Sequence, residues 1–212
     1  MKPSVAKEQI LKNIRSALIN RTPNPFPNTD FDKDIYTESK DTNDVLFAKE
    51  FTKVNGQFIY CSDTYDFANN FRSLIEEKKW KNIHCLNKDL LDLFKHMQVK
   101  DICESQDLLE AEVGVTNCES LIARTGSVLI SSADSNGRQL SILPPVHVVV
   151  ASTDQLAYDL KEAFDLLKRK YKGNYPSMLS VTTGPSRTAD IEKTIVLGAH
   201  GPKELFVFLI EK

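Results

Sequence analysis

Residues 177–205 read SMLSVTTGPSRTADIEKTIVLGAHGPKEL, and the rest of the chain can be placed around this segment. Its first part is a short apolar run, 178–181, which ends in the residues TTGP at 182–185. Gly and Pro after an apolar run are typical of a buried strand that stops and turns. Because Pro185 suits a first helical turn and Asp190 would lie near its positive end, we predict that a helix begins at once.

A strand, a Gly-containing turn and a helix N-terminus together make an anion site, since unpaired backbone N–H groups converge there. Arg187 adds a planar guanidinium that suits two-pronged binding of a phosphate or carboxylate. The alternative is a capped strand-helix junction with a solvated arginine, because short turn motifs often match by chance. The candidate ligand-binding residues of this segment are Thr183, Gly184, Pro185, Ser186, Arg187 and Thr188.

A second Gly-rich segment, LGAHGP at 197–202, lies just before the last predicted strand, 205–210. Its glycines and Pro202 imply a tight loop around His200. In doubly wound sheets ligands bind at the carboxyl ends of strands, and we expect His200 and Gly201 to lie at such an end. His200 is therefore a candidate for proton transfer or anion binding, although histidine also supports turns through ordinary hydrogen bonds.

Composition indicates a soluble globular protein. The chain has 212 residues, 41% hydrophobic and 26% charged, which fits one domain with an appendage. A net charge of −2 and a pI near 6.1 argue against a nucleic-acid-binding surface, which is normally basic. No apolar stretch reaches the roughly 20 residues that span a bilayer, and the charged N-terminus lacks a signal-peptide core. We expect a cytoplasmic protein with no nucleic-acid or membrane partner.

The cysteine spacing argues against a metal site in this chain. Cys61, Cys85, Cys103 and Cys118 lie 24, 18 and 15 residues apart, with no C-x-x-C. Zinc ribbons and locally encoded iron–sulfur clusters need closely spaced thiolates. We expect reduced, mostly structural thiols and no cofactor held by this chain.

The middle of the chain alternates between strand-like and helix-like segments. A capping box at 152–155 predicts a helix whose apolar stripe runs to Tyr171. This order is typical of βαβ units, so we predict an α/β fold with a mostly parallel sheet and helices on both faces. The other expected elements are strands at 57–61, 82–86, 146–150 and 205–210, and helices at 43–54, 64–80 and 88–97.

The N-terminal part reads as a separate arm. Residues 4–20 carry apolar side chains at helical spacing, and the segment RTPNPFPN at 21–28 then forbids a helix. We therefore divide the chain into a helical arm with its Pro-rich linker, 1–40, and an α/β domain, 41–212. The apolar face of the arm could dock on its own domain, on a second copy of the chain in a homo-oligomer, or on a different protein. Deleting residues 1–28 should leave a folded domain.

Two strand-like runs, 120–123 and 127–131, flank Arg124-Thr125-Gly126. A β-type turn or bulge at Gly126 is the simplest account of this pattern. Arg124, beside the turn, is either a base that faces a ligand or a surface charge. Both residues are candidates for the ligand site.

His147 interrupts a run of β-branched residues, 146–150, of the kind that parallel sheets bury on both faces. The pattern favours a core histidine with one hydrogen-bonded nitrogen over a catalytic acid or base.

Four segments together resemble a known family. GVTNCESLIARTGSVLISS, GRQLSILPPVHVVVAS, TTGPSRTADIEKT and LGAHGPKELFVFLI, in this order, are similar to the lactate-utilisation (LUD) domain family and to its short C-component members. The resemblance covers residues 113–212, and upstream of them only the layout is similar. Asn117 stands where many relatives have glycine, but Asn also tolerates left-handed geometry, so the turn is little affected.

The resemblance implies a three-layer α/β fold similar to the sugar-phosphate isomerase and CoA-transferase-like superfamily. It also implies a role in oxidising L-lactate to pyruvate, alongside two partner proteins of which at least one carries iron–sulfur clusters. Nothing in the composition or spacing indicates lactate. The lack of closely spaced cysteines in this sequence fits a component that does not itself carry the electrons.

Two functions from different classes follow from these patterns. In the first, the chain is an accessory component of a lactate-oxidising assembly, whose TGPSR loop holds a small anion. In the second, it is an enzyme in its own right that acts on a phosphorylated or CoA-linked substrate. Such an enzyme needs a nucleophile or base, and Glu119, Glu192 and His200 are the candidates, although Glu119 is equally well explained as a solvated turn residue. A purely structural scaffold agrees less well with an anion-type turn and its arginine.

Overall fold

The structure, a computed structural model, describes residues 5–19, 23, 25–30, 36, 39–105, 107–133, 137–189, 195–198 and 200–212. The chain divides into two compact units, Met1–Glu38 and Ser39–Lys212. The first unit contains α1 (Val5–Ile19), which confirms the predicted N-terminal helix over the described residues. Ile14 and Leu18, which belong to its apolar stripe, are exposed within this unit.

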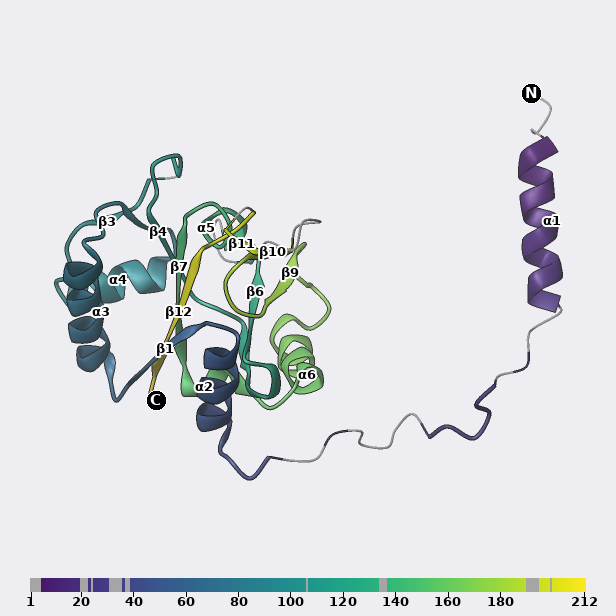
Figure 1. The fold of residues 1–212 in the computed structure, drawn as a ribbon, viewed down its shortest axis with the longest axis horizontal. Coiled ribbons are helices and arrows are strands. Elements are labelled where there is room, and N and C mark those ends of the chain that lie inside the picture. The colour runs from purple at the N-terminus through teal and green to yellow at the C-terminus, as the bar shows by residue number, and fades with distance from the viewer. Residues whose placement is uncertain are drawn as a thin grey trace. The chain divides into compact units, whose positions relative to one another are not determined.

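The second unit is built on a six-stranded sheet in which every neighbouring pair is parallel (Figure 1). In spatial order its strands are β1 (Gln57–Cys61), β12 (Glu204–Ile210), β7 (Val146–Ser152), β4 (Val113–Thr116), β2 (Ile83–Cys85) and β3 (Ile102–Cys103). The four expected strands are present, and β3 and β4 join them. Because β7 and β12 are buried on both sides, their near-continuous apolar runs have the pattern expected of central parallel strands.

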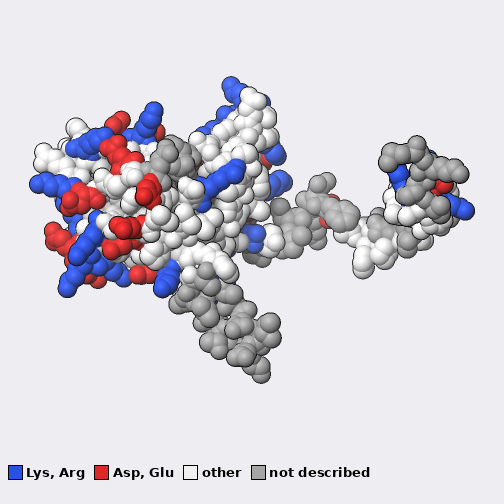
Figure 2. All heavy atoms as spheres, turned by 90° about the horizontal axis from the view of Figure 1, so that it is seen from above, with Lys and Arg blue, Asp and Glu red and all other residues white. Residues whose placement is uncertain are grey.

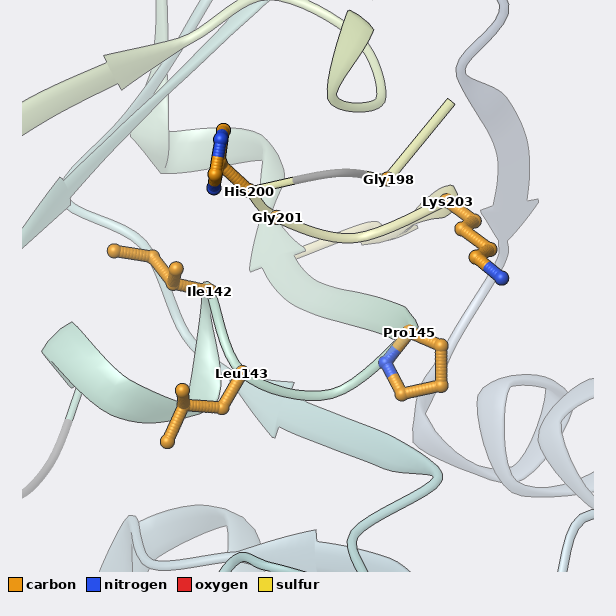
Figure 3. Close-up of a pocket in the computed structure, with 7 residues that line it drawn as sticks. All are labelled: Ile142, Leu143, Pro145, Gly198, His200, Gly201 and Lys203. Atoms are coloured by element: carbon orange, nitrogen blue, oxygen red, sulfur yellow. The ribbon is translucent and has the colours of Figure 1, made fainter. Parts of the chain in front are cut away.

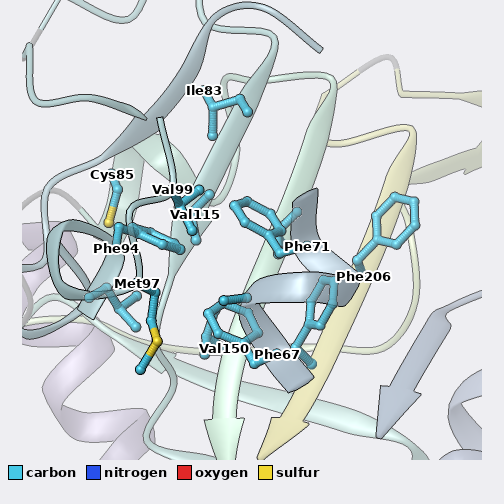
Figure 4. Packing of buried hydrophobic residues seen from close by; sticks show 14 of the residues in the cluster. Phe67, Phe71, Ile83, Cys85, Phe94, Met97, Val99, Val115, Val150 and Phe206 are labelled. Atoms are coloured by element: carbon cyan, nitrogen blue, oxygen red, sulfur yellow. The ribbon is translucent and has the colours of Figure 1, made fainter. Parts of the chain in front are cut away.

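Helices α3 (Thr64–Lys78) and α4 (Lys88–His96) cover one face of this sheet (Figure 1). Their apolar stripes bury phenylalanines against the strands, and Figure 4 shows this cluster. Phe67 and Phe71 both meet the ring of Phe208 edge-on, with centroids 5.3 and 5.7 Å apart. The two helices start where the sequence indicates, since Asp63 and Asn87 accept N-cap hydrogen bonds from Asp66 and Leu90.

The other face of the main sheet packs on α2 (Asn43–Lys53) and on a second sheet, outside which lies α6 (Leu160–Tyr171). The second sheet has the order β8 (Leu156–Ala157), β5 (Ser120–Ile122), β6 (Ser127–Ser131) and β9 (Leu179–Thr182). The predicted α/β class, with a mostly parallel sheet and helices on both faces, is confirmed. The second sheet, with its antiparallel β5–β6 and β6–β9 pairs, adds a layer that the sequence patterns did not separate.

The capping box at 152–155 is present, but it starts only the 3₁₀ turn η2 (Thr153–Gln155). Strand β8 follows at once and pairs with β5, so the chain cannot enter a long helix there. Helix α6 starts five residues later, at Leu160, after a separate N-cap on Asp159. The predicted long helix is therefore right at its end and wrong at its start.

The helix predicted from Pro185 is wrong. The chain instead forms β10 (Arg187–Ala189), which pairs antiparallel with β11 (Ile195–Leu197). The backbone of Ser186 is already engaged, since its N–H donates to the carbonyl of Pro202 and its carbonyl accepts from Gly198. These long-range hydrogen bonds outweigh the local helix signals, so the anion-binding helix terminus that the sequence suggested does not exist.

Two short elements complete the second unit: the 3₁₀ turn η1 (Ala123–Thr125) and α5 (Gly137–Leu140). The turn at Gly126 is confirmed, with a left-handed φ of 57°.

Candidate functional site

All six strands of the main sheet run in the same direction. Their amino ends therefore lie together on one side of the sheet, which we call the amino edge, and their carboxyl ends lie on the opposite side, the carboxyl edge. The loop around His200 precedes β12, so it lies at the amino edge. Its expected position at the carboxyl ends of strands is wrong. The rule behind the prediction concerns loops that follow strands of a parallel sheet, whereas this loop precedes the strand β12.

Three of the candidate segments nevertheless meet at the amino edge. Ser186 hydrogen-bonds through its backbone to Gly198 and Pro202, at 3.0 and 2.9 Å, which joins the TGPSR turn to the LGAHGP loop. The hydroxyl of Ser127 lies 2.8 Å from that of Thr183 and joins the turn to the ARTG segment. The sequence therefore identified segments that are neighbours in space, although for a different structural reason.

The C-terminal end of α2 supports these segments. Gly126 packs so closely on this helix that a Cβ there would lie 2.3 Å from the backbone nitrogen of Phe51. Gly184, with φ of 76°, would place a Cβ 2.3 Å from the carbonyl oxygen of Val54. Arg187 donates a hydrogen bond of 3.2 Å to the same oxygen. The arginine thus satisfies a carbonyl at the end of a helix, a role that the sequence did not indicate.

An open recess of about 410 Å³ lies beside these loops (Figure 3). We call it the amino-edge recess, and its lining residues are Ile142, Leu143, Pro145, Gly198, His200, Gly201 and Lys203. Ile142 and Leu143 give it an exposed apolar wall. His200 and Lys203 are the basic side chains among these seven residues, none of which is acidic. Such a lining suits a ligand with one anionic and one apolar part.

The other candidates that the structure describes do not line the amino-edge recess. Arg124 is half-buried, and its backbone N–H donates to the carbonyl of Tyr158. Pro185 is buried behind the turn and Thr183 is exposed on it. Glu192 lies outside the described residues, as does the side chain of Thr188.

Glu119 is a buried network residue and not a solvated turn residue. Its side chain is 7% exposed and accepts hydrogen bonds from the hydroxyls of Ser131 and Tyr171, at 2.5 and 2.6 Å, and from Lys170 at 2.7 Å. Burial raises the pKa of this carboxyl, but the donors from Lys170, Ser131 and Tyr171 outweigh it and hold the pKa below its usual value. The network joins the loop after β4 to α6 and β6, so Glu119 lies apart from the amino-edge recess.

His147 is a core histidine, as the pattern indicated. It is fully buried, its Nε2 lies 2.9 Å from the hydroxyl of Thr116, and its Nδ1 has no hydrogen-bond partner among the described residues. Burial lowers the pKa of His147 to about 3, which keeps the ring neutral.

A second pocket, of about 570 Å³, lies at the carboxyl edge, and none of the residues that line it is a candidate from the sequence. The ends of β7 and β12 and the first turns of α3 and α4 contribute to its lining. Asn87, Asp89 and Asp154 are among its polar residues and could have been found as polar positions after predicted strands.

The described residues contain no group of three or more His, Cys, Asp or Glu side chains that could hold a metal ion. All four cysteines are free, and Cys61, Cys85 and Cys118 are buried. No helix within the described ranges is both long and apolar enough to cross a membrane. On the face seen in Figure 2, acidic and basic side chains are interspersed over the second unit.

Comparisons with known proteins agree on one family. The sequence model of the LUD domain matches residues 46–210. "Lactate utilization protein C" of Bacillus licheniformis is 32% identical over 104 residues, which are 48% of this chain and 43% of that protein. The protein of the same name in Halalkalibacterium halodurans is 27% identical over 66% of each chain. The matches thus span 43% and 66% of the lengths of these two curated relatives.

One solved structure has the same fold. The crystal structure of a DUF162 family protein from Deinococcus radiodurans matches with a TM-score of 0.58 and 16% sequence identity, over 78% of this chain and 94% of that one. At this identity the likeness concerns the fold alone.

Proposed function

The chain belongs to the LUD domain family, and from this premise we propose that it is an accessory component of a lactate-utilisation system. In this proposal it works with partner proteins, at least one of which carries iron–sulfur clusters, in the oxidation of L-lactate to pyruvate. The name of its relatives in Bacillus licheniformis and Halalkalibacterium halodurans supports the role in lactate utilisation. The four cysteines do not form a ligand set, which supports placing the clusters in the partners.

The observation that carries the proposal for a small-anion site is the lining of the amino-edge recess. His200 and Lys203 supply positive charge or hydrogen-bond donors, and Ile142 and Leu143 supply an apolar surface. A short 2-hydroxy or 2-oxo acid has a carboxylate at one end and a methyl group at the other. In our proposal the carboxylate binds to the basic side chains and the methyl group packs on the apolar wall.

The alternative is a stand-alone enzyme that acts on a phosphorylated or CoA-linked small molecule. The size of the amino-edge recess favours this second function, because about 410 Å³ is in the range of sites for ligands larger than a three-carbon acid. His200 would then be its acid or base, since it lines the recess and Glu119 does not.

Binding to the recess can be measured by isothermal titration calorimetry with L-lactate, pyruvate, a sugar phosphate and acetyl-CoA. His200→Ala and Lys203→Ala should each raise the Kd of the bound anion about tenfold, the effect of losing one charge-assisted hydrogen bond. Lys161→Ala, on an exposed turn of α6, is the matched control and should leave the Kd unchanged. An equal Kd of the anion for wild type and for both recess variants would show that the anion does not bind in the recess.

The role in lactate utilisation needs a separate test. A host that lacks this chain should fail to grow on L-lactate as sole carbon source, and wild-type protein should restore growth. The His200→Ala, Lys203→Ala double variant should not restore it. Normal growth without the chain contradicts the accessory role. Turnover of a CoA ester or sugar phosphate by the purified chain alone would favour the enzyme.

A cytoplasmic location and a binding role for α1 complete the proposal. The apolar stripe of this helix, which is exposed within its own unit, offers a surface for a partner protein or for a second copy of the chain.

A further inference from the structure

We propose that the pocket at the carboxyl edge is a second ligand site, and that it binds a neutral, hydroxyl-rich ligand of the nucleoside class. This carboxyl-edge pocket has a volume of about 570 Å³, within the range of small-molecule sites. It also lies where ligands bind in open parallel sheets, beyond the carboxyl ends of the strands. The inference is independent of the proposed role in lactate utilisation, since it concerns the opposite edge of the sheet.

One part of the pocket is apolar. Val150 and Ala151 of β7 and Ile210 of β12 line it from the sheet, and Leu90 and Leu93 line it from α4. Four of these five residues are buried, so their positions are fixed by the core. The sheet and α4 therefore both present apolar surface to this pocket, which suits a ring such as a nucleobase.

The polar part of the pocket combines carboxylates with amide and hydroxyl side chains, which can accept hydrogen bonds as well as donate them. The side chains of Asp89, in the first turn of α4, and of Asn117, after β4, make no hydrogen bond to the residues that the structure describes, so both are available to a ligand. Asp154 and Glu211 add two more carboxylates.

The existing contacts leave the pocket with an excess of negative charge. Lys212, the one basic residue of its described lining, lies 3.2 Å from the carboxylate of Asp154. Glu211 accepts a hydrogen bond of 2.6 Å from the hydroxyl of Tyr60. A carboxylate only accepts hydrogen bonds, so a ligand must donate them. A phosphate or carboxylate on the ligand would meet like charge, and ribose hydroxyls would meet acceptors.

The two edges therefore select opposite ligands. The amino-edge recess has basic side chains and suits an anion. The carboxyl-edge pocket has an apolar wall and free acceptors, and it suits an uncharged ring that carries several hydroxyls. A nucleoside has both features, with its base on the apolar wall and its ribose toward Asp89 and Asn117.

The test uses the full chain, with adenosine and adenosine 5′-monophosphate as probes. Calorimetry gives the Kd, and chemical-shift changes of the labelled protein give the location. Adenosine should bind with a Kd at or below the millimolar range and shift the residues that line the carboxyl-edge pocket. Asp89→Ala and Asn117→Ala should each raise its Kd about tenfold, because each removes a hydrogen-bond partner. The monophosphate should bind at least tenfold more weakly than adenosine.

Asp92→Ala is the matched control, since Asp92 is an exposed aspartate of the same helix that does not line the pocket. The Kd of adenosine for this variant should equal that for wild type. The proposal is overturned if adenosine produces no shifts at millimolar concentration, or if the shifts map to the amino-edge recess. It is also overturned if the monophosphate binds as tightly as adenosine. If Asp89→Ala unfolds, Asn117→Ala keeps the test valid, because the side chain of Asn117 makes no hydrogen bond to the described residues that its loss would break.

Discussion

The amino and carboxyl edges of the main sheet differ in how their loops are held. At the amino edge, Gly126 and Gly184 pack closely on the end of α2, and backbone hydrogen bonds of Ser186 join the TGPSR turn to the LGAHGP loop. At the carboxyl edge, charged side chains fix the loop after β4, through Glu119 and its partners. The difference teaches that a Gly-rich motif can mark close backbone packing as readily as a ligand loop.

The two edges should therefore be sensitive to different kinds of substitution. Added side-chain volume should disturb the amino edge, because backbone atoms there leave no room for a Cβ. Neutralisation of a carboxylate should disturb the carboxyl edge, because Glu119 accepts three hydrogen bonds in its charged form.

The largest effect is expected from Gly126→Ala. A Cβ would meet backbone of α2 at 2.3 Å, and the left-handed φ of 57° adds strain. Together they should lower the free energy of unfolding by about 3 kcal/mol, measured by urea denaturation. Gly173→Ala is the control, since Gly173 also has a positive φ, 97°, but has nothing within 4 Å of an added Cβ. Equal losses in the two variants would show that packing on α2 contributes nothing.

Glu119→Gln should cost about 2 kcal/mol, less than Gly126→Ala, because it weakens hydrogen bonds to a charged acceptor without adding volume. The contribution of Glu119 is present above its usual pKa of 4.5 and is lost as the pH falls through its lowered pKa in the folded state. The difference between wild type and variant should therefore shrink below pH 4.5. Glu110→Gln, at an exposed position, is the control. A constant difference across this pH range would contradict the role of the charge.

His147→Gln should change the pH dependence of stability more than stability itself. The pKa of His147 is about 3 in the folded protein and 6.5 when unfolded, so the unfolded state takes up a proton first as the pH falls. Stability should decrease below pH 6.5 by up to about 1.4 kcal/mol per pH unit. Urea denaturation between these values should show a shallower slope for His147→Gln, and an unchanged slope for the exposed His96→Gln. Equal slopes for wild type and His147→Gln would mean that the ring is protonated inside the fold.

Arg187→Ala should have a smaller effect. The sequence alone predicts a loss of anion affinity worth about 1.5–3 kcal/mol. In the structure, the guanidinium donates to the carbonyl of Val54, so we expect a loss of about 1 kcal/mol in the free energy of unfolding and little change in anion affinity. Calorimetry and denaturation on the same variant separate the two outcomes. A large loss of affinity with unchanged stability would return Arg187 to the ligand site.

The smallest effect is expected from deletion of residues 1–28. These residues belong to the first compact unit, so the unfolding temperature of the second unit should stay within about 1 °C of wild type. A large decrease would show that the arm is part of the core.

Much of the main sheet could be predicted, because its elements follow strong local patterns. The run 205–210 is apolar throughout, and the run 146–150 is interrupted by His147 alone. The caps at Asp63 and Asn87 fix where helices begin. Strand β3 has only two residues, too few for any pattern to emerge.

The site was harder to predict than the fold. The TGPSR segment has the local signals of a helix start, yet it is held in another conformation by two long-range backbone hydrogen bonds. Ser186 donates one to Pro202 and accepts the other from Gly198. Sequence identified which segments meet but not the edge at which they meet. Glu119 shows the same limit, since its partners Ser131 and Tyr171 are 12 and 52 residues away along the chain.

The pairing of β1 with β12 has a consequence for folding kinetics. Gln57 lies opposite Phe206, so the two strands join parts of the chain about 150 residues apart. Among the described residues, strand β1 pairs with β12 alone, and β12 lies between β1 and β7. Closing such a long loop costs entropy before any contact repays it, so this pairing should form late. Until β12 is in place, the start of the domain has no neighbour to pair with, and its unpaired strand is open to association with other chains.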